Sequence, residues 1–248
     1  MSDHRRLLLI ANPAAGGGRC ARVLPDVEAA LRRWAGDVRA ERTRDLEHAE
    51  RLAAEAVGDG RVAVALGGDG LIGRVAGVVA ARDGLLAPLP GGRGNDVVRC
   101  LGAPRDPVLG AVALAGACER RIDLGEAGGR PFLGIASVGF DSDVQVIANR
   151  ARLVRGSQVY TYAALRAVLA WRPATFSVAL DGAPPREVVG WAVAAANSSH
   201  YGGGMRLAPG AALDDGLLDV VLSKRTSKVR FLAGFPKVFT GRHVDEPS

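Results

Sequence analysis

The stretch RVAVALGGDGLIGRVAGVVA, residues 61–80, passes from an apolar run through a cluster of glycines into a helical pattern. Residues 61–66 predict a short buried strand, and residues 71–80 predict a helix that packs against a sheet. Glycines at such a turn let the backbone approach a ligand closely and direct amides at an anion. Asp69, in the middle of the turn, would repel a bare phosphate but suits a divalent cation held between the two. The stretch therefore predicts a site for nucleotide phosphates with a metal.

Composition narrows the class of protein. The 248 residues suffice for one large domain or two small ones, and 48% apolar with 23% charged residues is ordinary globular usage. No apolar run reaches the length of a membrane span, and the polar residues 1–6 lead directly into a strand, unlike a signal peptide. The three cysteines lack metal-ligand spacing, which favours idle reduced thiols and a cytoplasmic location.

Lysine is almost absent from the chain. The three lysines are Lys224, Lys228 and Lys237, so the first 223 residues contain no phosphate-binding lysine of the P-loop or protein-kinase type. P-loop nucleotide hydrolases and protein kinases are therefore excluded. The net charge of +6 is compatible with anionic lipid, nucleotide or nucleic acid. Of these we expect lipid and nucleotide partners and no nucleic acid.

The predicted elements change in character along the chain. Residues 1–121 alternate strands with helices, which predicts an α/β nucleotide-binding domain with a mostly parallel, Rossmann-like sheet. Residues 122–248 contain short strand-like runs between turn signals, which predicts a second, mainly antiparallel, β-sandwich-like domain. The expected strands are residues 7–11, 38–42, 61–66, 86–90, 121–124, 131–138, 175–180, 188–196 and 217–222, and the expected helices are residues 23–34, 46–57, 71–80, 96–101, 106–117 and 160–170.

Four glycine-bearing turns carry the candidate chemistry, although each can also be an ordinary connection. They are residues 12–16, 67–70, 89–96 and 197–204. Turns that follow successive strands of a parallel sheet lie along one edge, so the first three are expected to converge. Arg93 in the third turn can bind phosphate through two nitrogens, while Asp96 suits a helix N-cap.

Acidic residues follow the fourth turn. Asp214, Asp215 and Asp219 lie around a glycine, and they can hold a hard cation through carboxylate and backbone oxygens or form a solvated turn.

Taken in order, these motifs resemble the diacylglycerol kinase catalytic-domain family, which includes bacterial lipid kinases and sphingosine kinases. The resemblance runs from Leu8 to about Pro247, although the glycine–acid turn alone is shared with the wider phosphofructokinase and NAD-kinase superfamily. The matching segments are residues 12–16, 67–70, 90–96, 134–141, 202–209 and 215–219. The resemblance implies an α/β nucleotide domain and a β-sandwich-like lipid-side domain, with the active site in the cleft between them.

The resemblance further implies an ATP-dependent lipid kinase that uses Mg²⁺ to transfer the γ-phosphoryl group to a lipid hydroxyl, of the diacylglycerol or sphingoid-base class. Asp69 would be the catalytic residue that orients the metal-bound phosphates. A structural cation would bind the backbone oxygens of Ala212 and Leu217 and the carboxylate of Asp215. The positions implied to bind the nucleotide are Asn12, Pro13, Ala14, Ala15, Gly16, Thr43, Gly67, Gly68, Asp69, Gly70, Leu71, Ile72, Gly73, Arg93, Gly94 and Asn95.

The chain departs from the family pattern in four places. Leu71 stands where the family usually has Thr, Arg74 where it commonly has an acid, and Arg93 where it often has Thr. The family's catalytic carboxylate belongs to an Asp-Gly-Glu motif downstream of the position that matches Pro247, together with the last strands of the second domain. One alternative is therefore a nucleotide- or lipid-binding member with weak or no transfer activity. Another is a NAD-kinase-like enzyme, whose Asn-Glu pair is replaced here by residues 95–96, Asn-Asp.

A lipid acceptor implies peripheral contact with a membrane. Arg150, Arg152 and Arg155, flanked by Leu153 and Val154, form a candidate basic and apolar edge for an anionic surface. A solvated helix face is the alternative. Unpaired sheet edges would favour a homodimer.

Overall fold

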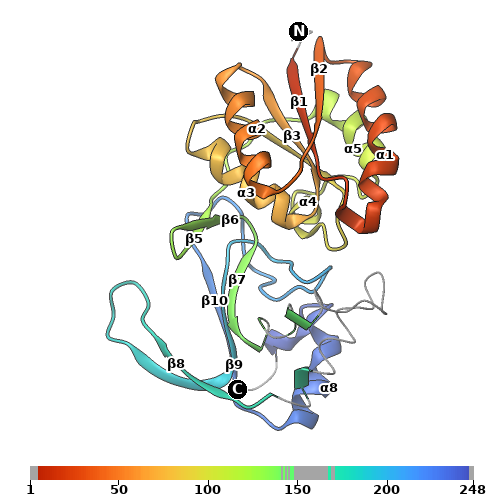
Figure 1. Ribbon diagram of the computed structural model, residues 1–248. Helices are drawn as coiled ribbons and strands as arrows, with labels where there is room; N and C mark the ends of the chain where they lie inside the picture. The colour runs from red at the N-terminus through yellow and green to blue at the C-terminus, as the bar shows by residue number, and fades with distance from the viewer. Residues whose placement is uncertain are drawn as a thin grey trace. The chain divides into compact units, whose positions relative to one another are not determined.

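The computed structural model describes residues 5–140, 142, 144, 146–147, 167–168 and 171–245 (Figure 1). It consists of two compact units, Met1–Gly134 and Ile135–Ser248. The first is α/β with a parallel sheet and the second is mainly antiparallel β, so the fold class predicted from the sequence is confirmed.

A parallel four-stranded sheet lies between two layers of helices in the first unit. Its strands run in the order β2-β1-β3-β4, with α1 and α5 on one face and α2 and α3 on the other (Figure 1). The elements are β1 (Arg6–Ala11), α1 (Ala15–Arg32), β2 (Asp37–Arg42), α2 (Leu46–Gly58), β3 (Val62–Gly67), α3 (Asp69–Ala80), β4 (Leu86–Pro90), α4 (Asp96–Cys100), α5 (Pro107–Ala113), η1 (Leu114–Gly116), β5 (Gly125–Ala127) and β6 (Arg130–Phe132).

Strand β1 supplies both hydrophobic cores of this unit. Leu8 and Ile10 pack with α2 and α3, whereas Leu7 and Leu9 pack with α1 and α5. All four side chains are buried. Because successive side chains of a strand point to opposite faces, a central strand covered on both sides is a continuous apolar run, as the sequence indicates.

The hairpin of β5 and β6 belongs to the first unit because it packs on α3. A Cβ atom at Gly77 of α3 would lie 2.3 Å from Cγ of Pro131, so the two elements touch closely. The division between the units therefore falls after Gly134, later in the chain than the boundary expected after residue 121.

Gly77→Ala is expected to lower the free energy of unfolding by about 1–3 kcal/mol, because the rigid Pro131 ring has to move. Gly73 lies one turn earlier on α3 and has open space around a Cβ atom. Gly73→Ala should therefore be neutral, or stabilising by up to about 1 kcal/mol through helix propensity. Urea unfolding of the two variants measures the difference, and equal effects would contradict the close docking of the hairpin.

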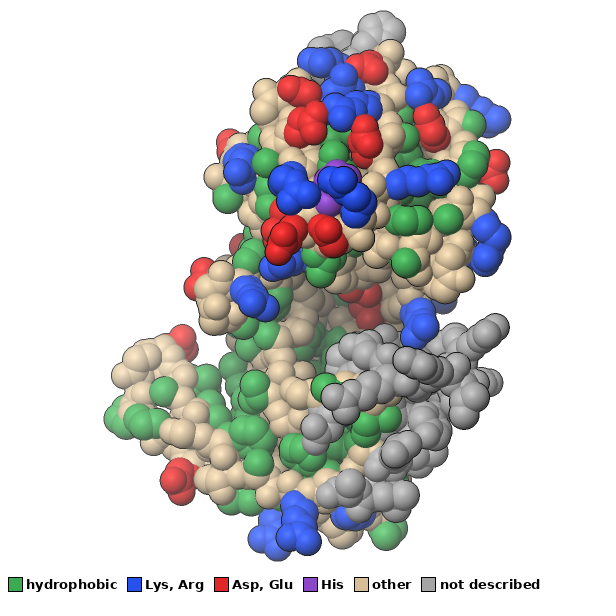
Figure 2. Space-filling model, in the orientation of Figure 1, with side chains coloured by type: hydrophobic (Ala, Val, Ile, Leu, Met, Phe, Trp, Pro, Cys, Tyr) green, Lys and Arg blue, Asp and Glu red, His purple; other side chains and the backbone are tan. Residues whose placement is uncertain are grey.

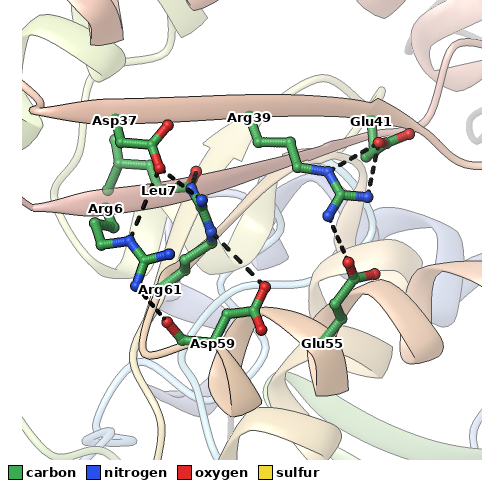
Figure 3. Close-up of polar contacts among 8 residues, drawn as sticks. All are labelled: Arg6, Leu7, Asp37, Arg39, Glu41, Glu55, Asp59 and Arg61. Carbon is green, nitrogen blue, oxygen red and sulfur yellow. Dashed lines mark hydrogen bonds and ion pairs between the residues drawn. The ribbon is translucent and has the colours of Figure 1, made fainter.

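Charged residues lie along the edge strand β2 and the beginnings of its neighbours (Figure 3). Arg61, with 11% of its side chain exposed, donates to Asp37 Oδ2 at 2.6 Å and to the Leu7 carbonyl at 3.2 Å. Arg39 pairs with Glu41 and Glu55. Such charges on an edge strand hinder pairing with another chain.

Asp37→Asn is expected to cost more stability at pH 7 than at pH 3. The hydrogen bond from Arg61 lowers the pKa of the Asp37 carboxyl. Since the folded pKa lies below the unfolded value of about 4, the pair stabilises the fold fully above that value, and the contribution is lost as the pH falls through the folded pKa. Denaturant unfolding at both pH values measures the change, with Asp26→Asn as a control. A pH-independent effect would contradict this linkage.

The second unit is built on the long strand β9. Strands β7 and β10 flank its second half and β8 pairs with its first half, all antiparallel. Phe140, Trp191 and Phe231 form the centre of its core, with Trp191 stacked on Phe231 at a centroid distance of 4.2 Å. The elements are β7 (Ile135–Gly139), β8 (Ala174–Val178), β9 (Arg186–Ala196), β10 (Asp219–Lys224), α8 (Lys228–Val238) and η2 (Arg242–Asp245).

Several element boundaries differ from the expected ones. The run 131–138 is divided between β6 and β7, and residues 121–124 form no strand because Ile122 and Leu124 instead pack irregularly on the first core. The helix expected over 106–117 ends at Ala113 and tightens into η1, and β10 begins at Asp219 rather than 217. The helix expected over 160–170 lies outside the described residues, apart from 167 and 168.

Two further expectations concern cysteines and membranes. Cys20 is buried, and desolvation raises the pKa of its thiol to about 11, so it is a protonated core group at neutral pH.

Among the helices of the described residues, none has the length and apolarity needed to span a bilayer.

Candidate functional site

The loops that follow β1, β3 and β4 meet at the C-terminal edge of the parallel sheet. The Gly91 amide donates to the Gly67 carbonyl at 2.7 Å, and the Asn12 amide donates to the Leu66 carbonyl at 3.0 Å. Backbone hydrogen bonds therefore join the third turn to the second and the first turn to the end of β3, as the parallel topology predicts.

Glycines allow these turns to touch backbone to backbone. A Cβ atom at Gly92 would lie 2.4 Å from Cα of Gly68, and one at Gly16 would lie 2.7 Å from the Gly91 oxygen. No side chain fits in either contact. Beside them, a Cβ atom at Gly70 meets nothing within 4 Å, so the turn is open on its outer side.

The turn after β1 continues into an unusual start of α1. Asn12 Oδ1 accepts the Ala14 amide at 3.0 Å, which closes the turn. Gly16, Gly17 and Gly18 then all have positive φ angles, of 61°, 67° and 85°. This left-handed segment suits glycine alone, and it explains why the regular helix begins later than Ala15.

Asp69 occupies the first position of α3 at the centre of these turns. Its Oδ1 atom accepts the amide of Val97 at 3.1 Å and so caps the short helix α4. Its Oδ2 atom makes no hydrogen bond with the part of the chain that the structure describes, and the side chain is only half-buried. Oδ1 of Asp69 therefore has a structural role, whereas Oδ2 is available to bind a cation.

The turn after β4 is held by Asn95, which has a left-handed backbone with φ of 53°. Its side chain accepts the Gly92 amide at 2.8 Å and donates to the Gly92 carbonyl at 3.1 Å. The N-cap role expected for Asp96 is wrong, because Asn95 holds the cap position and Asp96 pairs with Arg99 at 2.9 Å. Arg93 projects from the same turn and is exposed.

Three residues of the expected nucleotide set have buried side chains. Leu71 and Ile72 have 3% and 0% of their surface exposed, and their amides donate to the Gly68 carbonyl. Leu71 packs beneath Gly67, where a Cβ atom would lie 2.5 Å from its Cδ2 atom. The Leu71 side chain is therefore part of the hydrophobic core. Thr43, at the end of β2, is 7% exposed and donates its amide to the Ala11 carbonyl at 2.8 Å.

Arg74 replaces the acid that the family pattern commonly has at this position. It forms a salt bridge of 3.1 Å with Glu50 and thereby joins α3 to α2. Glu50 therefore neutralises the charge of Arg74 on the surface of the first unit.

The turn expected to hold a structural cation lies on the surface of the second unit. Asp215 Oδ1 accepts the Leu217 amide at 3.0 Å around Gly216, which has a φ of 73°. The donor set, one carboxylate and the carbonyls of Ala212 and Leu217, suits a hard cation. Within the described ranges no three His, Cys, Asp or Glu side chains gather into a metal site, so a cation here would depend on backbone oxygens.

The second unit also contains a groove of about 670 Å³ under α8. Its walls are the inner face of α8, strand β10 and the segment around Pro209, and they are mainly apolar. The expected membrane edge at residues 150–155 lies outside the described residues.

Three glycine-bearing turns of a parallel sheet thus meet around one carboxylate, an arrangement suited to phosphate groups, and an antiparallel β unit follows in the chain. Residues 6–127 match the model of the diacylglycerol kinase catalytic domain, and residues 134–248 match the YegS C-terminal NAD kinase beta sandwich-like domain. The chain belongs to the diacylglycerol kinase catalytic-domain family of lipid kinases, and its second domain is of the YegS C-terminal type.

Proteins similar to this chain include ones named as diacylglycerol kinases and as lipid kinases. A diacylglycerol kinase from Mycobacterium tuberculosis is 34% identical over 249 residues, which cover 97% of this chain and 80% of that protein. A probable lipid kinase YegS-like from Pseudomonas fluorescens is 36% identical over 238 residues, 89% of this chain and 73% of that protein. A putative diacylglycerol kinase from Bacillus anthracis str. Sterne has the same fold, with a TM-score of 0.78 at 24% identity over 95% of this chain and 80% of that chain.

Proposed function

We propose that this protein is an ATP-dependent lipid kinase that transfers the γ-phosphoryl group of ATP to the hydroxyl of a diacylglycerol or a sphingoid base. The observation that carries the proposal is the contact of three glycine-bearing turns around Asp69. Gly16, Gly68 and Gly92 keep side chains out of the contacts between the turns, so a polyphosphate can approach the backbone there.

The protein groups at this edge would mainly position the reactants and balance charge, which is what phosphoryl transfer requires of a protein. The turns would hold the nucleotide by backbone contacts. Arg93 is exposed and would add the positive charge that lysine supplies in other phosphate-binding proteins. Asn95 keeps the third turn in its left-handed form, so it would act on the nucleotide through the loop it fixes.

The residues present fit a divalent cation beside the nucleotide. Asp69 Oδ2 is the oxygen that would hold it, since Oδ1 is already engaged by the Val97 amide. When bound, Mg²⁺ shields the charge on the transferring phosphoryl group.

The acceptor class rests on family membership together with the groove of the second unit. Phe231, Phe235 and Val220 line that groove, which has the size and apolar character that an alkyl chain requires. These features favour a lipid acceptor over a small soluble one.

A second candidate is a family member that binds nucleotide or lipid without efficient transfer. Such a member would act without an effective general base for the acceptor hydroxyl, which costs about 10²–10⁴ in rate. The NAD-kinase-like alternative has less support, because Asp96 is 7% exposed and is engaged by Arg99.

Incubation with ATP labelled at the γ-position, Mg²⁺ and a panel of lipids in mixed micelles tests the proposal. We expect label in a diacylglycerol or a sphingoid base, and no label when Mg²⁺ is chelated. Nucleotide binding without any labelled lipid would favour the binding-only candidate. When NAD is added to the same incubation, labelled NADP without any labelled lipid would overturn the proposal.

A further inference from the structure

We propose that the outward face of α8 docks on an anionic lipid bilayer. This face and its flanks, called the α8 surface below, combine exposed apolar side chains with cations. The α8 surface consists of Lys224, Arg225, Lys228, Val229, Leu232, Lys237, Phe239 and Arg242. The inference does not depend on phosphoryl transfer, since it concerns adhesion to a bilayer with or without an acceptor.

The inner face of α8 fixes the direction of its outer face. Phe231 stacks on Trp191 with an interplanar angle of 14° and meets Phe140 edge-on at 5.0 Å. Phe235, one turn further on, packs against the same core. Ser227 caps the helix by accepting the Arg230 amide at 3.2 Å. The helix is therefore anchored from one side, and the residues opposite the phenylalanines face solvent.

The outer face of α8 is apolar although it is exposed. Val229 is 78% exposed, Leu232 is 37% exposed and Phe239, just after the helix, is 47% exposed. Ala233 and Pro236 share this face and are exposed as well. A stripe of exposed apolar residues on a helix that is anchored from its other side is typical of an interfacial segment.

The charges around this stripe are mainly positive. Residues 220–244 contain six cations and no Asp or Glu, and the acids on either side of this range are Asp219 and Asp245. Figure 2 shows Lys and Arg side chains, with hydrophobic ones nearby, at the lower end of the second unit in that view. Long basic side chains can lay their stems on apolar surface while their charges reach lipid headgroups.

The sign of the charge selects the occupant. Two copies that met through the α8 surface would bring like charges together in a partly apolar contact, which is unfavourable. An anionic bilayer offers opposite charge and an apolar layer for Val229 and Leu232 at the same time. An anionic bilayer is therefore the partner that matches both the cations and the apolar side chains of the α8 surface.

Sedimentation with vesicles tests the electrostatic half. The full chain should bind vesicles of phosphatidylcholine mixed with phosphatidylglycerol, and binding should weaken as salt shortens the screening length from about 10 Å to about 3 Å. Combined Lys224→Gln, Arg225→Gln and Arg242→Gln should weaken binding roughly 100-fold, at about fivefold per cation. Equal binding to vesicles of phosphatidylcholine alone would overturn the proposal.

The matched control removes the same charge from the first unit. Arg33, Arg51 and Arg105 are exposed and form no ion pair within the described part of the chain. Changing all three to Gln should leave vesicle binding within about twofold of the unchanged protein, because only charges near the bilayer contribute. An equal loss in both triple variants would mean that net charge alone attracts the protein, and would overturn the assignment to α8.

Val229→Asp tests the apolar half, with Leu109→Asp on α5, where the leucine is 62% exposed, as its control. Only Val229→Asp should weaken vesicle binding. If light scattering instead finds a dimer that Val229→Asp dissociates while vesicle binding is unchanged, the face belongs to a second copy of the chain and the proposal fails.

Discussion

Asp69→Asn is expected to lower lipid phosphorylation by roughly 10²–10³-fold, on the scale of losing one electrostatic contributor at a reacting centre. The substitution removes the negative charge that would hold Mg²⁺. The amide oxygen of Asn can still accept the Val97 amide, as Oδ1 of Asp69 does at 3.1 Å. The fold should therefore survive while transfer fails. Labelled-ATP assays across a range of Mg²⁺ concentrations, with circular dichroism as the check on folding, measure the two effects separately.

Asp69→Ala separates the structural role of Asp69 from its electrostatic role. Alanine removes the cap of α4 as well as the charge, so it should cost a further 1 kcal/mol or so of stability, on the order of a lost N-cap. Asp26→Asn, an exposed acid on α1, is the control for charge alone. If Asp69→Asn retains transfer and its Mg²⁺ dependence, Asp69 is only a helix cap and the central assignment fails.

Gly92→Ala is expected to weaken ATP binding by more than about tenfold and to lower the free energy of unfolding by about 1–3 kcal/mol, the usual cost of overpacking. Its Cβ atom would lie 2.4 Å from Cα of Gly68 and 3.2 Å from the Gly68 nitrogen. Both neighbours are backbone atoms, so the two turns have to separate. The separation would displace the loop that carries Arg93 and Asn95.

Calorimetric titration with ATP and urea unfolding measure the two consequences of Gly92→Ala. Gly58→Ala, at the end of α2, is the matched control because a Cβ atom there meets nothing within 4 Å. An ATP affinity that is unchanged in Gly92→Ala, despite a measurable loss of stability, would show that the contact between these turns is structural and that the nucleotide binds elsewhere.

The sequence was sufficient for the sheet of the first unit and for the convergence of its turns. Apolar runs and glycine turns locate β1, β3 and β4, and in a parallel sheet the carboxyl ends of successive strands lie on one edge. The motifs that follow in order were sufficient for the family, which the matches over residues 6–127 and 134–248 confirm.

Only the tertiary structure decided what several individual side chains do. The sequence alone suggested Asp96 as a cap, whereas Asp96 pairs with Arg99. The side chain of Leu71, a position for which the family resemblance implies nucleotide binding, fills the core beneath Gly67. The cap of α4 comes instead from Asp69, 28 residues earlier in the chain.

The physical reason for this division is the range of the interactions. Periodicity and turn chemistry act between near neighbours in the chain, so the sequence by itself determined the order of the elements and the edge at which the glycine turns meet. Contacts such as Gly68 with Gly92, or Gly77 with Pro131, join segments far apart in the chain, and packing selects them from many sterically possible pairs. Asp69 therefore followed from the sequence as a candidate, and the fold decided which of its two oxygens is left for a cation.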